Sequence, residues 1–187
     1  MKQLNNFILE KLKINSKSKI NHYNYKPKDK WELRELVDKL INERGKNADL
    51  NDIDVSEITD LSGLFFKLDP YDIKIDRWNV SNVENMRGAF YACKNFNCDL
   101  SDWNVSKVID MENLFSFCIN FNSDISKWDV KNVENMNYTF FKCRSFNYDL
   151  NNWNTQSLKK TNIVNTFKES KLEDNDNIPD WYKNIIN

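Results

Sequence analysis

Three aspartates that could do chemistry recur at a constant interval of 25 residues: Asp99, Asp124 and Asp149. If copies of a repeat stack at one strand spacing, ~4.8 Å, these carboxylates repel one another unless something compensates them. The compensating group could be a backbone N–H group of a turn, a neighbouring lysine, a cation held between copies, or a contact with a partner. We expect turn capping, because calcium-binding β-rolls place their aspartates in a glycine-rich repeat that this sequence lacks.

The other residue types that carry chemistry form no catalytic constellation. The single histidine, His22, lies in the linker, so no Ser-His or Cys-His catalytic pair can be built elsewhere in the chain. Cys93, Cys118 and Cys143 share one position of the repeat and lack the paired C-x-x-C spacing of a zinc site, which predicts buried, reduced thiols. The three glycines are too few for a phosphate-binding loop. We therefore expect no enzyme activity, no cofactor and no metal.

Composition and charge narrow the class of partner. The chain has 187 residues, is 40% hydrophobic and carries a net charge of −1, so it can form a packed domain and has no basic excess for nucleic acid. No stretch approaches the roughly 18 apolar residues of a membrane-spanning helix. Charged residues interrupt the apolar stretch in residues 1–19, which argues against a signal peptide. We expect a cytoplasmic protein that binds another protein, without nucleic acid or membrane contact.

The interval of 25 residues extends far beyond the aspartates. It aligns Trp78, Trp103, Trp128 and Trp153, and weaker copies precede and follow these. The other aligned apolar residues are Val80, Val105 and Val130; Val83, Val108 and Val133; Met86, Met111 and Met136; Phe90, Phe115 and Phe140; and Phe96, Phe121 and Phe146. Because one copy cannot bury its own apolar side chains, the repetition predicts that the copies stack on one another.

Each copy is long enough for one strand and one helical turn. We place the strand near residues 98–103 and the helical turn near residues 84–93, where Met86, Phe90 and Cys93 follow helical spacing. The chain has 30 asparagines but only three glycines and three prolines, so polar side chains must make its turns. The fold class that follows is an α/β repeat solenoid of about five coils.

The repeated phrase FN-x-D-[LI]-S-x-W-[ND]-V-S-x-V-x-x-M-x-x-x-F resembles the BspA-type leucine-rich repeat. That family is common in mycoplasma lipoproteins and in bacteria and phages of the gut, and the resemblance covers residues 48–181. It implies a right-handed leucine-rich-repeat solenoid that binds proteins or surfaces. Many relatives are secreted adhesins or lipoproteins, and this chain differs from them in lacking an export signal.

Residues 28–47 predict a helix that caps the first coil. Asp29 suits the N-cap and Gly45 the C-terminal end. The expected apolar stripe consists of Trp31, Leu33, Leu36, Val37, Leu40 and Ile41. The alternative is that this helix docks a partner.

Residues 1–27 form a leader and linker, of which residues 1–13 are a second amphipathic candidate. The leader resembles short N-terminal leaders of gut phage proteins, so it either completes the cap or docks a separate partner. The predicted organisation is leader and linker 1–27, capping helix 28–47, solenoid 48–181 and tail 182–187.

We expect a non-enzymatic protein–protein interaction module. The presented residues should flank the inward-facing Leu100, Ile125 and Leu150. They are Asp99, Ser101, Asp102, Asp124, Ser126, Lys127, Asp149, Asn151 and Asn152. Two alternatives remain: a phage virion or assembly protein that is docked or packaged through its leader, and a surface adhesin domain without its export signal.

Overall fold

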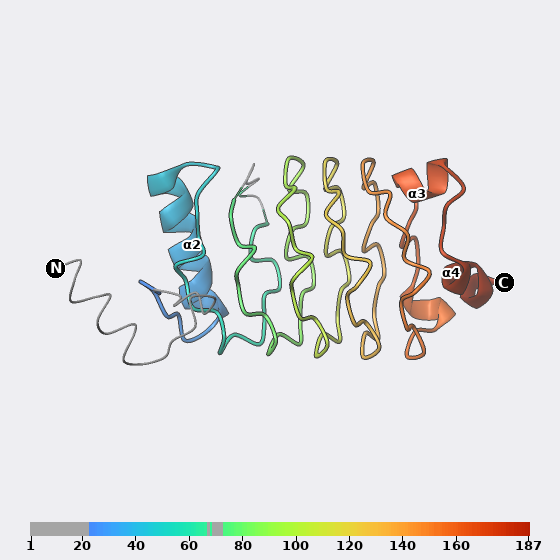
Figure 1. Ribbon diagram of the computed structural model, residues 1–187, viewed down its shortest axis with the longest axis horizontal. Helices are drawn as coiled ribbons and strands as arrows, with labels where there is room; N and C mark the ends of the chain where they lie inside the picture. The colour runs from blue at the N-terminus through green and yellow to red at the C-terminus, as the bar shows by residue number, and fades with distance from the viewer. Residues whose placement is uncertain (1–22, 67, 69–72) are drawn as a thin grey trace, which may run out of the picture.

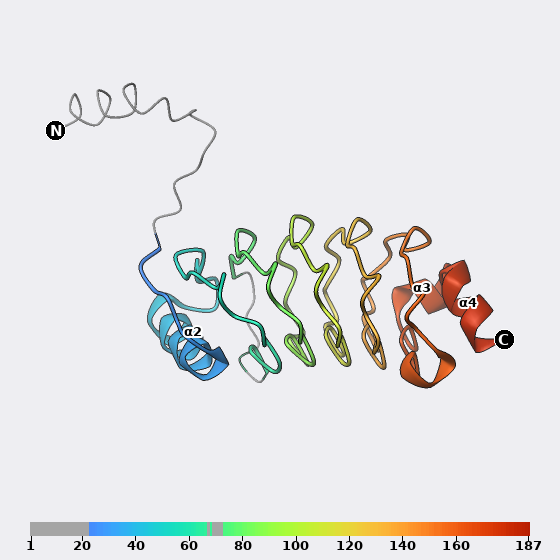
Figure 2. The same cartoon turned by 90° about the horizontal axis from the view of Figure 1, so that it is seen from below.

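The computed structural model describes residues 23–66, 68 and 73–187. Over this part the chain winds into coils that stack along one axis, with helices at both ends (Figures 1 and 2). The helices are α2 (Lys30–Arg44), the 3₁₀ helix η1 (Lys160–Asn162), α3 (Lys171–Asp174) and α4 (Asp180–Ile186). His22 and the predicted leader helix, residues 1–13, lie outside the described residues. None of the helices in the described ranges is long and apolar enough to cross a membrane.

Aromatic side chains from neighbouring coils stack inside the molecule. The rings of Phe65 and Phe90 lie 5.1 Å apart, and those of Phe90 and Phe115 lie 5.6 Å apart. Trp78 and Trp103 stack nearly parallel, with their ring centroids 6.5 Å apart. All five side chains are buried. Equivalent residues of the repeat therefore share one apolar core.

The tryptophans also tie the coils together by hydrogen bonds. Nε1 of Trp103 donates to the carbonyl of Ile75 at 3.1 Å, and Nε1 of Trp128 donates to the carbonyl of Leu100 at 3.0 Å. The same bond to the preceding coil is made by Trp78, Trp153 and Trp181. Since a buried indole N–H needs an acceptor, this column fixes the register of the stack.

The backbone bonds between coils do not lie where the sequence predicts them. The strand expected at residues 98–103 is not formed, and the helical turn expected at 84–93 is a run of turns. Gly88 and Phe90 donate their N–H groups to the carbonyls of Glu112 and Leu114 in the next coil. The N–H group of Ala89, between them, donates to Met86 and closes a turn within the coil, and Gly88 has a left-handed φ of 59°. Consecutive turns thus reproduce the side-chain spacing of a helix while alternate N–H groups bond the next coil. We call these bonds the inter-coil ladder.

Asparagine and aspartate side chains make the corners of each coil. The side chains of Asn79 and Asn85 accept hydrogen bonds from the N–H groups of Ser81 and Arg87. Equivalent bonds recur at Asn104, Asp110, Asp129, Asn135 and Asn154. Such turns satisfy a backbone donor locally, which explains how a chain with so few glycines and prolines turns so often.

Helix α2 covers the first coil. Asp29 is its N-cap, as predicted, and its carboxylate accepts from the N–H groups of Trp31 and Glu32. The buried residues are Leu33, Val37, Leu40 and Ile41. Trp31 is 69% exposed, so its assignment to the apolar stripe was wrong. It precedes Leu33 by two residues, which places it about 200° around the helix from the buried face.

The C-terminal end is covered by short helices. The predicted tail, residues 182–187, belongs largely to α4, whose Trp181, Tyr182 and Ile185 pack partly buried against the core. The ring of Trp181 stacks 6.5 Å from that of Trp153, as expected for a final partial copy of the repeat. The leucine-rich-repeat class and the right-handed winding stay predictions.

Candidate functional site

The three stacked aspartates cap turns. Asp99 Oδ1 accepts from the N–H of Ser101 at 2.9 Å. Asp124 Oδ1 accepts from the N–H and the hydroxyl of Ser126 at 3.1 and 2.7 Å. Asp149 makes the equivalent bonds to Asn151, both at 2.8 Å. The turn-capping interpretation is therefore confirmed.

These bonds also keep two of the carboxylates charged. The N–H and hydroxyl of Ser101, with the hydroxyl of Ser123, lower the pKa of Asp99 below its ordinary value. The hydroxyl and N–H of Ser126 lower the pKa of Asp124. Both groups are therefore ionised at neutral pH, although they lie in one column.

A column of asparagines runs beside the aspartates. The side-chain oxygen of Asn97 accepts from the N–H of Asn122 at 2.7 Å, and that of Asn122 accepts from the N–H of Asn147 at 3.1 Å. The last member, Asn147, accepts from the side chain of Asn175 at 3.1 Å. Each asparagine therefore bonds the next layer, and the column is held rigidly against the acidic one.

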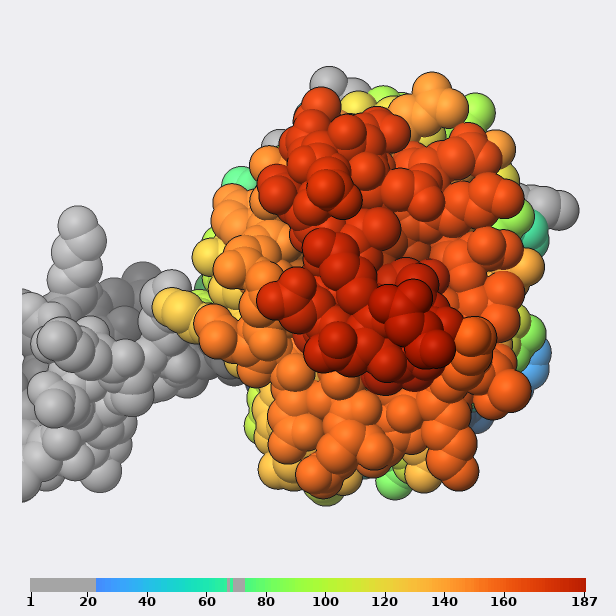
Figure 3. Space-filling model, turned by 90° about the vertical axis from the view of Figure 1, so that its right-hand side faces the viewer, coloured from blue at the N-terminus to red at the C-terminus, as the bar shows by residue number. Residues whose placement is uncertain are grey.

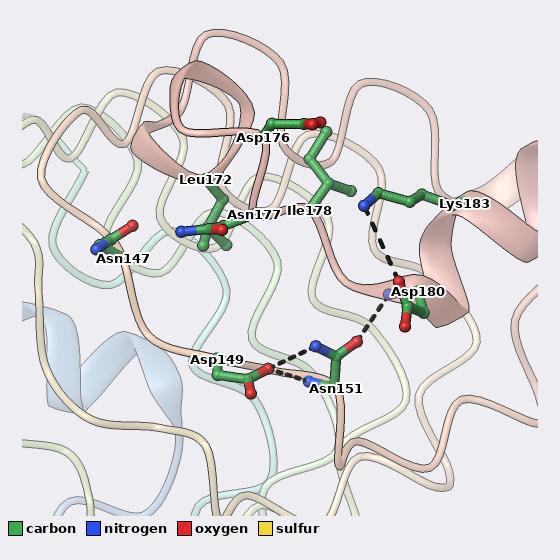
Figure 4. A pocket seen from close by; sticks show the side chains of 9 residues that line it. All are labelled: Asn147, Asp149, Asn151, Leu172, Asp176, Asn177, Ile178, Asp180 and Lys183. Atoms are coloured by element: carbon green, nitrogen blue, oxygen red, sulfur yellow. Dashed lines mark hydrogen bonds and ion pairs between the residues drawn. The ribbon is translucent and has the colours of Figure 1, made fainter.

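Two hollows lie along these columns, and together we call them the polar groove. The first, of about 360 Å³, spans two coils and is lined by Asn97, Asp99, Ser101, Asn122, Ser123, Asp124, Lys127 and Tyr148. The second, of about 420 Å³, continues the same columns beneath the C-terminal helices. It is lined by Asn147, Asp149, Asn151, Leu172, Asp176, Asn177, Ile178, Asp180 and Lys183 (Figure 4).

The second hollow joins the repeat to the C-terminal cap. The side-chain oxygen of Asn151 accepts from the N–H of Asp180 at 2.8 Å, which links the last aspartate turn to the start of α4 (Figure 4). Lys183 lies 3.9 Å from the carboxylate of Asp180. Leu172 and Ile178 add an apolar side to a hollow that is otherwise polar.

Six of the nine predicted site residues line the groove. Asp99, Ser101, Asp124 and Lys127 line the first hollow, and Asp149 and Asn151 line the second. The other three, Asp102, Ser126 and Asn152, line neither hollow. The prediction assumed the alternation of a strand, whereas this stretch is a turn that aims successive side chains differently.

The sequence interpretation missed lining residues of two kinds. The asparagine column repeats with the aspartates and could have been included, whereas Ser123 stands where the neighbouring copies have Cys98 and Tyr148. Asp176 and Lys183 lie outside the repeat, so periodicity gave no signal for them, whereas Asp180 lies in the final partial copy and aligns with Asp102.

The groove presents polar groups that can form hydrogen bonds. It offers carboxylates and amide oxygens as hydrogen-bond acceptors and an ammonium group at each hollow. Within the described part of the chain, no group of three or more His, Cys, Asp or Glu side chains is placed to hold a metal ion. The Cys143 thiol donates to the carbonyl of Phe115 at 2.9 Å, and burial raises its pKa, so it is a core residue and not a reactive thiol.

Comparison with known proteins gives one family. The family model described as "Mycoplasma protein of unknown function, DUF285" matches residues 32–116 and 59–181, which contain every lining residue of the groove except Lys183. No curated protein and no solved structure matches the chain.

Proposed function

The chain belongs to the DUF285 family of mycoplasma proteins of unknown function, and we propose that it acts as a non-enzymatic module that binds another protein along the polar groove. The partner segment would present ammonium, guanidinium or amide N–H groups to Asp99, Asp124 and Asp149. We further propose that the stack is a BspA-type leucine-rich-repeat solenoid.

The observation that carries this proposal is the charge of the aspartate column. Elsewhere in the same coils an asparagine caps the turn as well as an aspartate does: Asn104 and Asp129 occupy one repeat position. A turn at residues 99, 124 and 149 therefore needs no negative charge. Like charges in one column repel one another, and only Asp124 is partly compensated, because the charge of Lys127 lowers its pKa; no salt bridge to any of the three aspartates is formed among the described residues. A cationic partner would compensate the charges of the aspartate column.

Rigidity supports the same proposal. The groove is made from turns and asparagine bonds that recur in each layer, so its acceptors keep a fixed spacing before a partner arrives. A pre-organised surface loses less conformational entropy on binding, and several weak contacts can then sum to useful affinity.

The decisive variant is D99N/D124N/D149N. Asparagine keeps each turn bond and removes only the charge, so folding is preserved. The matched control is D129N, another turn-capping aspartate outside the groove. Partners that the immobilised protein captures from the native host are quantified by mass spectrometry. Their amount should fall about tenfold for the triple variant and stay unchanged for the control. Equal capture by wild type and triple variant would reject the groove as the binding site.

The other functional predictions do not depend on the polar groove. Docking or packaging through residues 1–13 concerns a segment outside the described residues. The adhesin alternative and the cytoplasmic localisation likewise stay predictions.

A further inference from the structure

The last coil leaves a row of backbone donors without acceptors in a further coil. In the coil before it, the N–H groups of Tyr138 and Phe140 donate across the inter-coil ladder. The equivalent groups of the last coil belong to Ile163, Asn165 and Phe167. Over the described ranges, none of these three N–H groups donates to another coil or to a side chain; that of Ile163 only closes the last 3₁₀ turn of η1 on the Lys160 carbonyl. We call them the terminal donor row.

The terminal donor row is shielded as well as unpaired. Ile163 is 0% and Phe167 1% exposed, so water does not replace the missing acceptors there. A fourth N–H in the series, that of Glu169, donates to the carboxylate of Glu173 at 2.7 Å. This contact shows what the other three positions require, which is an oxygen acceptor. Buried donors without acceptors destabilise the closed state of this end.

The cover over the terminal donor row is weakly held. None of the residues of α4 is fully buried, and its N-cap, Pro179, supplies no side-chain bond. Its two ends are bonded to the side chains of Asn151 and Lys160, and its main packing attachment is Trp181, whose Nε1 donates to the carbonyl of Leu150 at 2.9 Å. Figure 3 shows α3 and α4 lying across only part of this end, beside the surface of the last coil. Val164 and Ile186, 43% and 36% exposed, add apolar surface to it.

We propose that the C-terminal end of the stack is a second docking surface, separate from the polar groove, where an extended segment of a partner protein displaces α4 and pairs with the terminal donor row. The segment supplies a carbonyl oxygen at every second residue, as the last coil does for the coil before it. Such backbone pairing is a known mode of peptide recognition and is tolerant of sequence.

The pattern of donors argues against a second copy of this chain as the occupant. If two copies met through their C-terminal ends, each would present N–H donors to the other, and donors cannot hydrogen-bond to donors. At the N-terminal end, α2 covers the first coil, and Arg34 already binds the ladder carbonyls of Leu64 and Phe66. A separate polypeptide with a free backbone edge remains as the occupant.

The test uses the full-length ¹⁵N-labelled protein and a synthetic peptide copying residues 158–170. This segment supplies ladder carbonyls to the preceding coil, so it is matched to the equivalent donors. Without peptide, amide exchange at Ile163, Asn165 and Phe167 should be about tenfold faster than at Tyr138 and Phe140. Added peptide should slow amide exchange at the three residues of the terminal donor row by about tenfold and leave exchange at Tyr138 and Phe140 unchanged.

Two tryptophan variants separate displacement of α4 from nonspecific binding. W181A removes the main attachment of α4 and should tighten the peptide about tenfold. W31A removes an exposed tryptophan at the opposite end and should leave the affinity unchanged. The proposal fails if the peptide leaves the three amides unaffected in both wild type and W181A, or if W31A tightens binding equally. It also fails if the three amides exchange as slowly as Tyr138 without peptide, or if raising the protein concentration alone protects them, because a second copy would then be the occupant.

Discussion

The two ends of the stack are closed by different chemistry. At the N-terminal end, four residues of α2 are buried, and Arg34 donates to the carbonyls of Gly63, Leu64 and Phe66. At the C-terminal end, α4 has no fully buried residue and leaves the terminal donor row unpaired. The first closure replaces the hydrogen bonds of a missing coil, whereas the second covers mainly apolar surface.

The difference follows from the direction of the inter-coil ladder. A first coil exposes carbonyl oxygens, and one guanidinium with its several N–H donors can satisfy them together. A last coil exposes N–H groups, which need separately placed oxygens. Only Glu173 is seen to supply one among the described residues. The stack should therefore be more stable at α2 than at α4.

Removing a core side chain from each capping helix should give the largest contrast. Leu40 of α2 is fully buried, so L40A should lower the free energy of unfolding by about 3 kcal/mol. Ile185 of α4 is only partly buried, and I185A should lower it by less than about 1 kcal/mol. Urea unfolding of both variants measures the difference. Equal losses would contradict the proposed asymmetry of the two ends.

Removing the guanidinium that binds the first coil should have the next largest effect. R34A leaves ladder carbonyls of Leu64 and Phe66 without their donor and should cost about 2 kcal/mol of unfolding free energy. The control is R144A, because Arg144 is exposed and lies 3.9 Å from Glu169; its loss should be below about 0.5 kcal/mol. If the two arginine variants melt alike, Arg34 is not a hydrogen-bonding cap.

The attachment of α4 can be tested by removing a single hydrogen bond. W181F keeps an aromatic ring against Trp153 and removes the donor to the Leu150 carbonyl, for an expected loss of about 1 kcal/mol. The loss should be accompanied by faster amide exchange in α4 and not in α2. Faster exchange in both helices would mean that the two ends unfold as one unit.

Acid should weaken the N-terminal end, with the smallest effect. The hydrogen-bonded guanidinium of Arg44 lowers the pKa of Asp52 below its ordinary value of 3.8. The ionised pair therefore stabilises the folded state above about pH 4, and this contribution is lost as the pH falls through the lowered pKa. D52N should flatten the pH dependence of melting between pH 5 and 2. An unchanged profile would rule the pair out as a source of acid sensitivity.

Side-chain columns could be predicted from the sequence better than backbone bonding. The spacing of Trp103, Phe115 and Cys118 identified core residues directly, because only buried positions need constant size and polarity. The ladder could not be located the same way. Turns with left-handed residues such as Asn113 give apolar side chains a nearly helical spacing, so periodicity alone cannot distinguish the two.

The candidate site shows the same limit. Asp99 and Asp124 were identified because they repeat, and the turn bonds to Ser101 and Ser126 follow from ordinary aspartate chemistry. The second hollow depends on Asp180, the first residue of α4, whose N–H donates to the side chain of Asn151. That contact joins two segments that are distant in the sequence, and no local sequence pattern predicts it.

The stacking of equivalent residues can be measured most directly through the indole protons. In a two-dimensional NOE spectrum, the Nε1 proton of Trp103 should show contacts to Ile75, and that of Trp128 should show contacts to Leu100, each 28 residues earlier in the chain. Both protons should also exchange slowly with solvent. Indole protons that exchange rapidly and show contacts only to residues of their own coil would contradict the stacked arrangement, and with it both proposed binding surfaces.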